Sequence, residues 1–202
     1  MIAAIVLASG RATRMGEPKV LLRLGGRTLL AHVLAAARAS RCEAVVVVAG
    51  PNTAEVRREA EPFGARVVEN PRYAQGMATS LAAGIAALPP ACEGAVILLG
   101  DQPRVSAAAI DRLIAAHREA GKAIVLSRYG DVAGAPALFG QALFAEASSL
   151  TGDAGARRLA GRHPDWVTEV RLTEEEAWDV DTPEDLERLR QALEPDRPER
   201  PA

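Results

Sequence analysis

The sequence predicts an α/β fold in which helices cover both faces of a mostly parallel sheet. Short apolar runs, each bounded by turn residues, alternate along the chain with longer alanine-rich segments of helical length. These runs do not alternate apolar with polar residues, which indicates strands buried on both faces of a parallel sheet. At 202 residues the chain is long enough for one substantial core and short enough for one domain.

Strands and helices are expected in the order βαβαβαβαβ over the first 128 residues. The expected strands are residues 2–8, 44–49, 65–69, 95–99 and 123–127. The expected helices are residues 29–39, a helix capped by Asn52 that ends near 61, residues 76–88 before a Pro-Pro pair, and a helix capped by Ser106 that ends near 120.

The pattern changes after Arg128, where Gly130, Gly134, Pro136 and Gly140 break up any regular element. Helices are expected near 141–147 and 154–160, a strand at 166–172 and a last helix at 183–193. We predict one domain over residues 1–193, made of two regions, about 1–128 and about 129–193. The tail at 194–202 has three prolines among charges and is predicted to be disordered.

The composition argues against several classes of function. The net charge is −2 and aromatic residues make up 3%, so there is neither a basic surface nor an aromatic platform for nucleic acid. No stretch approaches the roughly 20 apolar residues that span a bilayer, and no basic residue precedes the first apolar run as in a signal peptide. Cys42 and Cys92 lack metal-ligand spacing and are expected to be buried thiols. We therefore expect a cytoplasmic protein with no membrane or nucleic-acid partner.

The first predicted strand ends in a turn at Ser9 and Gly10, which cationic residues follow, among them Arg14 and Lys19. Loops at the carboxyl ends of such strands bind ligands in open α/β sheets, and free N–H groups with cationic side chains suit phosphate. The loop is not a P-loop, because Glu-Pro follows Gly16, and it lacks the spaced glycines of a dinucleotide site. Taken alone, it could equally be a surface turn.

Two acidic turns could complete such a site. Asp101 directly follows the fourth strand, where a carboxylate faces the ligand crevice and could bind a divalent cation, or instead form a local Asx turn. Asp181 precedes a helix whose start is explained by Thr182 as N-cap, Pro183 at the first helical position and Asp185 as the capping partner. That explanation leaves the Asp181 side chain uncommitted.

The first loop, residues 7–19, resembles the Leu-Ala-Ala-Gly-x-Ser-x-Arg-Met-Gly-x-x-Lys signature of the MobA-like NTP transferases, with Ser9 and Ala12 as departures. Gly-Asp-Gln-Pro at 100–103 resembles the metal-binding motif of that family, and Asp-Thr-Pro-Glu-Asp-Leu at 181–186 resembles a second element. The resemblance implies a Rossmann-like fold of the nucleotide-diphospho-sugar transferase type. It also implies a Mg²⁺ site made by Asp101 and Asp181, with Asp179 as the rival second ligand.

Three further segments resemble elements found in the molybdenum cofactor cytidylyltransferases of this family. They are Asn-x-x-Trp/Tyr-x-x-Gly-Met-x-x-Ser-Leu at 70–81, Gly-x-Pro-x-x-Phe at 134–139 and Gly-Asp-x-Gly-Ala-Arg at 152–157. Without the resemblance, the first and last would be ordinary helix starts, with Asp153 as a cap. The implied nucleotide-binding residues are Leu7, Ala8, Ser9, Gly10, Arg14, Lys19, Asn70, Gly76 and Ser80. The implied acceptor-binding residues are Met77, Pro136, Phe139, Gly152, Asp153 and Arg157.

The resemblance implies a Mg²⁺-dependent nucleotidyltransferase that moves CMP from CTP to the molybdopterin form of the molybdenum cofactor and releases pyrophosphate. Arg14, Lys19 and Asp101 are the implied catalytic residues, and a client molybdoenzyme is an implied partner. Residues 1–128 would be the nucleotide-binding half and 129–193 the acceptor side.

Two alternatives remain open from the sequence. The first is the same chemistry with another NTP or acceptor, as in a guanylyltransferase or a phospholactate or sugar-phosphate nucleotidyltransferase. The second is a non-catalytic protein that binds a nucleotide cofactor. The pair of aspartates argues against this second alternative, because a carrier has no need of a metal placed for transfer.

Overall fold

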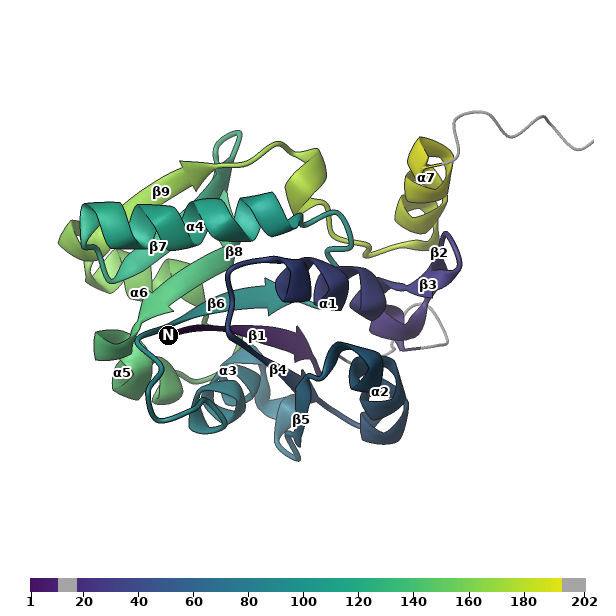
Figure 1. Ribbon diagram of the computed structural model, residues 1–202, viewed down its shortest axis with the longest axis horizontal. Helices are drawn as coiled ribbons and strands as arrows, with labels where there is room; N and C mark the ends of the chain where they lie inside the picture. Colours follow the sequence, from purple (N-terminus) through teal and green to yellow (C-terminus); the bar gives the residue numbers. More distant parts are fainter. Residues whose placement is uncertain (11–17, 194–202) are drawn as a thin grey trace, which may run out of the picture.

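Seven strands form the central sheet, in the order β5-β4-β1-β6-β8-β7-β9 (Figure 1). The computed structural model describes residues 1–10 and 18–193. The strands of this sheet are β1 (Ile2–Ala8), β4 (Ala44–Ala49), β5 (Arg66–Glu69), β6 (Gly94–Leu99), β7 (Ile124–Tyr129), β8 (Val132–Gly140) and β9 (Val167–Arg171). A separate hairpin pairs β2 (Arg23–Leu24) with β3 (Arg27–Thr28). The helices are α1 (Leu29–Ala39), α2 (Thr53–Ala60), α3 (Met77–Ala86), α4 (Ala107–Ala120), α5 (Phe144–Ser148), α6 (Ala156–Arg162) and α7 (Pro183–Leu193).

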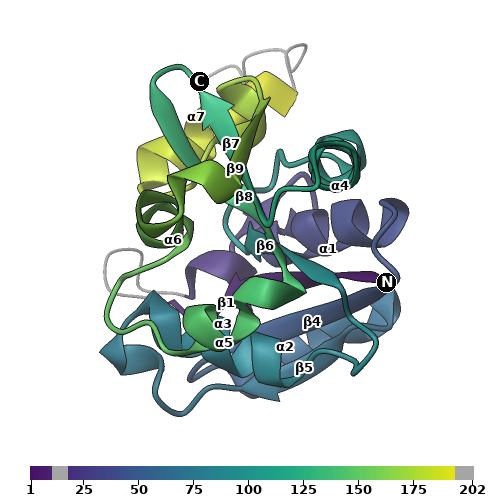
Figure 2. The same cartoon turned by 90° about the vertical axis from the view of Figure 1, so that its left-hand side faces the viewer.

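Helices cover both faces of this sheet. β1 lies between β4 and β6, is parallel to both, and is buried along its whole length. Alternate residues of β1 enter two separate cores: Ala4 and Val6 pack with α1, α2 and α4, whereas Ile5 and Leu7 pack with α3, α5 and α6. Figure 2 shows α1 and α4 on one side of the strands and α3 and α5 on the other. The prediction of a mostly parallel α/β sheet is therefore confirmed.

The strand β8 corrects the sequence prediction, which expected the glycines and proline after Arg128 to break up any regular element. β8 lies between β6 and β7 and is antiparallel to both. Its pairing with β7 shifts register between Leu126 and Ser127, and its pairing with β6 ends at Ala137. Pro136 falls in this unpaired stretch, where neither neighbouring strand requires the backbone N–H that proline lacks. The β2–β3 hairpin was also not predicted.

The three helices with a predicted N-cap start where the sequence indicated, and two of the three caps form the expected hydrogen bonds. Ser106 Oγ accepts a hydrogen bond from Ala109 N at 3.0 Å and caps α4 as predicted. Thr182 and Asp185 form the predicted capping box at α7, because each side chain accepts from the backbone N–H of the other. Asn52 occupies the predicted N-cap position of α2, but its side chain makes no capping hydrogen bond.

The two cysteines are buried thiols, as the sequence predicted. Cys42 and Cys92 are free and buried, and burial raises the pKa of the Cys42 thiol to about 11. In residues 1–10 and 18–193, no helix is both long and apolar enough to cross a membrane. The predicted disorder at 194–202 lies outside the described residues.

The close packing of α3 on the sheet can be tested at Gly84. A Cβ added there would lie 2.5 Å from Ile5 Cγ2 and 3.1 Å from Val48 Cγ2, both on fully buried side chains. We expect Gly84→Ala to lower the free energy of unfolding by about 1–3 kcal/mol, measured by urea titration. Gly161 in α6 is the matched control, because a Cβ there meets nothing within 4 Å. Gly161→Ala should stabilise the protein by up to about 1 kcal/mol, and equal stability of the two variants would contradict the packing described.

Candidate active site

The candidate site lies at the carboxyl end of the sheet, where β1 and β6 end side by side. Because these strands are parallel neighbours, the turn at Ser9 and Gly10 lies next to the turn at Gly100 and Asp101. Gly100 N donates to the Leu7 carbonyl at 2.9 Å. A Cβ on Gly100 would lie 3.1 Å from that oxygen, so glycine permits the close approach of the two chains. The sheet thereby places Asp101 beside the first loop.

Lys19 joins the two acidic turns that the sequence singled out. Its ammonium group contacts Asp101 Oδ2 and donates a hydrogen bond to Asp181 Oδ1 at 2.8 Å. Burial lowers the pKa of Lys19, but the neighbouring carboxylates raise it by more, so the net shift is upward. Lys19 is therefore charged at neutral pH, and two carboxylates from distant parts of the chain converge on one cation.

A backbone hydrogen bond holds the second acidic turn against the first. Val180 N donates to Asp101 O at 3.1 Å. The Val180 side chain is fully buried in a small core with Leu24, Leu29 and Leu189. Burial of Val180 thus fixes the position of the aspartates on either side of it, and α7 and the β2–β3 hairpin contribute to that fixation.

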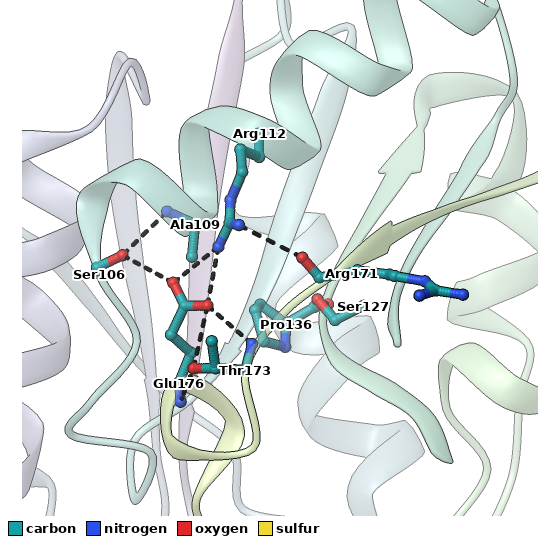
Figure 3. A network of polar contacts seen from close by, with 8 residues as sticks. All are labelled: Ser106, Ala109, Arg112, Ser127, Pro136, Arg171, Thr173 and Glu176. Carbon is teal, nitrogen blue, oxygen red and sulfur yellow. Dashed lines mark hydrogen bonds and ion pairs between the residues drawn. The ribbon is translucent and has the colours of Figure 1, made fainter. Parts of the chain in front are cut away.

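Glu176 anchors the segment that leads into this turn (Figure 3). Its carboxylate accepts hydrogen bonds from Arg112 Nη2 at 2.7 Å, Thr173 N at 3.0 Å and Ser106 Oγ at 3.3 Å. Burial raises the pKa of Glu176, but these donors lower it by more, so the net shift is downward. The short 3-10 helix Glu175–Ala177 is in this way tied to the start of α4.

Asp179, the rival for the second metal position, has a different partner. Lys19 donates to Asp181, whereas Gln102 donates a side-chain hydrogen bond to Asp179. Asp179 Oδ1 is buried and makes no hydrogen bond with any residue that the structure describes. Burial, followed by the negative charge of Asp101, raises the pKa of the Asp179 carboxyl to about 6.

Two adjoining cavities open at this edge of the sheet, with volumes of about 590 and 640 Å³. Both volumes are in the range of small-molecule sites. The smaller, which we call the Lys19 cavity, is lined among others by Ser9, Gly10, Lys19, Gly76, Ser80 and Asp101. The larger, which we call the Asp179 cavity, is lined among others by Gln102, Tyr129, Phe139, Gly152, Arg157 and Asp179. The side chains that line both are Leu7, Met77, Leu99 and Asp153.

The remaining predicted site residues lie behind the cavity walls or outside the described residues. Ala8 is buried in the core, and Asn70, also buried, donates to Ser80 Oγ at 2.9 Å. Pro136 is buried, and its carbonyl oxygen accepts from a serine hydroxyl within the sheet. Their positions suit support of the walls rather than contact with a ligand. Arg14 lies outside the described residues.

The wall between the cavities is a tight contact of two loops. A Cβ on Gly76, whose φ is +107°, would lie 2.4 Å from the carbonyl carbon of Gly152. Ala78 N donates to Gly152 O at 3.0 Å, and Met77 N donates to Asp153 Oδ1 at 3.3 Å. Asp153 therefore caps α3 and not the helix that follows it in sequence, where it would ordinarily be a cap if the resemblance were left aside.

Sequence reasoning missed Gln102 and Tyr129, and it singled out Asp179 only as the rival metal ligand and not as a residue of this cavity. Gln102 follows Asp101 directly, so proximity to a predicted ligand was the only available signal for it. Tyr129 ends β7, and its exposure to the cavity depends on the antiparallel β8, which was not predicted.

Two carboxylates are available at this site for a divalent cation. Among the described residues, no three His, Cys, Asp or Glu side chains group closely enough to hold a metal ion. Mg²⁺ needs fewer protein ligands, since it is commonly held by one or two carboxylates together with substrate phosphates. Asp101 and Asp181 already converge on one positive charge, that of Lys19, so this pair fits that mode of binding.

Comparison with known proteins places this geometry in context. Residues 4–167 match the MobA-like NTP transferase domain. The chain is 33% identical to nicotine blue oxidoreductase from Paenarthrobacter nicotinovorans over 201 residues, which cover 93% of this chain and 96% of that protein. The crystal structure of an Rv0371c homologue from Mycobacterium sp. strain JC1 is 34% identical, with a TM-score of 0.83 over 95% of this chain and 96% of the other. The crystal structure of Rv0371c from Mycobacterium tuberculosis in complex with manganese is 33% identical, with a TM-score of 0.77. The match covers 95% of this chain and 98% of that chain.

The contribution of Glu176 to stability should depend on pH. Its pKa is lower in the folded chain than the ordinary value of 4.5, so its stabilising effect is present above that pH and is lost as the pH falls through the lowered value. We expect Glu176→Gln to lower the free energy of unfolding by about 1–2 kcal/mol at neutral pH. The difference from wild type should shrink below pH 4.5 in melting experiments across the pH range.

The adjacent Glu175 provides a matched control. It pairs with Arg104 at 2.6 Å, but its side chain is 68% exposed. Glu175→Gln should cost less than about 0.5 kcal/mol. If both variants melt like wild type at neutral pH, Glu176 does not anchor the segment.

Proposed function

The chain belongs to the MobA-like NTP transferase family and is a nucleotidyltransferase, and we propose that it transfers CMP from CTP to the molybdopterin form of the molybdenum cofactor. The observation that carries the proposal is the convergence of Asp101 and Asp181 on Lys19. With a divalent cation held by the two carboxylates and Lys19 beside it, such an arrangement would neutralise charge around the phosphates during nucleotidyl transfer. The fold is the Rossmann-like type of the nucleotide-diphospho-sugar transferases.

We assign the nucleotide to the Lys19 cavity and the acceptor to the Asp179 cavity. The first loop, Lys19, Gly76 and Ser80 line the former, and Phe139, Gly152 and Arg157 line the latter. Met77 and Asp153 in the shared wall would lie next to both substrates. This division corresponds to a nucleotide-binding half at 1–128 and an acceptor side at 129–193, with α3 between the two.

The reaction needs little acid–base chemistry. An oxygen of the acceptor phosphate attacks the α-phosphorus of CTP, the bond from that phosphorus to the bridging oxygen breaks, and pyrophosphate leaves. The attacking phosphate is already ionised, so no residue has to remove a proton. A divalent cation held by Asp101 and Asp181 would supply further charge neutralisation, and Lys19 and Arg14 are proposed to bind phosphate oxygens. Mg²⁺ is the proposed cofactor, and the manganese complex of Rv0371c supports a divalent metal in this family.

The choice of CTP and molybdopterin rests on sequence motifs. Ala8-Ser9-Gly10 is nearer the Ala-Ala-Gly of the cytidylyltransferases than the Ala-Gly-Gly of the guanylyltransferases. The segment at 152–157 keeps the Gly-Asp-x-Gly-Ala-Arg element of the same branch. A client molybdoenzyme that receives the product is the implied partner.

Other functions make different predictions for one assay. Purified protein is incubated with each of the four NTPs, with or without molybdopterin, a sugar phosphate or phospholactate, and pyrophosphate is measured. A guanylyltransferase would release pyrophosphate only with GTP. A sugar-phosphate or phospholactate nucleotidyltransferase would release it with that acceptor and not with molybdopterin. A non-catalytic carrier, or an oxidoreductase like the relative from Paenarthrobacter, would bind ligand and release no pyrophosphate.

Asp101→Ala is expected to lower kcat for pyrophosphate release by about 10²–10³-fold or more. The reason is that one of the two carboxylates that hold the cation is lost, while circular dichroism should show an intact fold. Asp165→Ala is the control, because Asp165 is an exposed aspartate in the turn before β9. Normal turnover by the Asp101 variant would refute the assignment.

Removal of divalent cations with EDTA should stop pyrophosphate release, and added Mg²⁺ or Mn²⁺ should restore it. Asp181→Asn should raise the metal concentration for half-maximal activity by about 10-fold or more. Glu184→Gln, an exposed carboxylate three residues further along, should leave that requirement unchanged. An unaltered metal requirement in the Asp181 variant would exclude it as a ligand and favour Asp179.

A further inference from the structure

Asp179 takes no part in the pairing of Lys19 with Asp101 and Asp181, or in the hydrogen bonds of Glu176. It lines the Asp179 cavity, and its Oδ1 is buried without a hydrogen bond to any described residue. A buried carboxylate oxygen gains from a donor, and an ionised carboxylate offers acceptor positions only. An N–H or O–H group of a molecule that enters the cavity would provide the missing hydrogen bond.

The rest of the cavity wall restricts what can enter. Apart from Asp179, the deeper lining includes the apolar or aromatic side chains of Ile97, Phe139, Leu81 and Tyr129. A volume of about 640 Å³ with such walls suits a flat ring system. Arg157 and Arg158 also line this cavity and could bind the anionic group of an acceptor, which leaves Asp179 free to bind a hydrogen-bond donor.

We propose that Asp179 selects the acceptor by accepting a hydrogen bond at Oδ1 from an exocyclic amino group of a heterocycle, an inference that rests on the proposed function and names the recognised edge of its acceptor. Gln102, which is 1% exposed, donates to the same carboxylate and holds it in place. Lys19 donates to Asp181 and not to Asp179. Asp181 is thus available to bind a cation, and Asp179 to bind the acceptor. A pterin carries an amino group on one edge of its ring system, and such a group can donate the one hydrogen bond that Asp179 Oδ1 lacks.

The test compares two ring systems that differ at that edge. Pterin carries the amino group, and lumazine carries a carbonyl oxygen in its place. Their binding to the full-length protein is followed by their own fluorescence, without CTP, for wild type, Asp179→Asn and the surface control Asp165→Asn. Wild type and the control should bind pterin at least about 10-fold more tightly than lumazine. Asp179→Asn should lose at least about 10-fold in pterin affinity and keep its lumazine affinity.

Several outcomes would overturn the proposal. They are an unchanged preference in Asp179→Asn, an equal loss of both ligands in that variant, or no preference for pterin in wild type. Titration of Mn²⁺ into the same variants gives a second readout, since a loss of Mn²⁺ binding by Asp179→Asn would make Asp179 a metal ligand instead. Because no turnover is measured, the pterin preference can hold even if no pyrophosphate is released, so this inference and the proposed function fail separately.

Discussion

One ammonium group between two carboxylates is the arrangement on which the rest of the site depends. Asp101 and Asp181 would repel each other if no cation lay between them, and Lys19 provides that cation. These two negative charges and one positive charge leave the cluster with a net negative charge, which opposes the binding of a triphosphate. A divalent cation reverses that balance, so nucleotide and metal are expected to bind together rather than in a fixed order.

The packing around this charge cluster explains why it can persist at a solvent-facing edge. Asp101 is placed by a strand buried on both faces, and Val180 N attaches the second turn to the Asp101 carbonyl. Neither contact involves the charged atoms themselves. The carboxylates are therefore held by backbone hydrogen bonds and apolar burial, and a ligand can displace Lys19 without loss of the fold. Glu176 adds a third attachment through its hydrogen bond with Arg112.

The sequence was sufficient for the features that local rules determine. Buried strands followed by helices predicted the fold class, and the caps at Ser106 and Thr182 followed from residue type and spacing. The capping box also left Asp181 without a local role, which is why it could be singled out. By contrast, β8 depends on the register between its neighbours, since Pro136 is tolerated only because a shift in pairing leaves it opposite no partner. Asp179 was not recognised as a cavity residue for the same reason, because the cavity is walled by β8.

The contact between the start of α3 and the loop at Gly152 and Asp153, which separates the two cavities, limits the groups that can bind phosphate. The first N–H groups of a helix commonly bind anions, and α3 begins beside the Lys19 cavity. Here Met77 N and Ala78 N are already used, by Asp153 and by the Gly152 carbonyl. The carboxylate of Asp153 also offsets the positive end of the helix dipole. The start of α3 is thus committed to joining the two halves of the site, and compensation of phosphate charge would fall to Lys19, the first loop and the proposed cation.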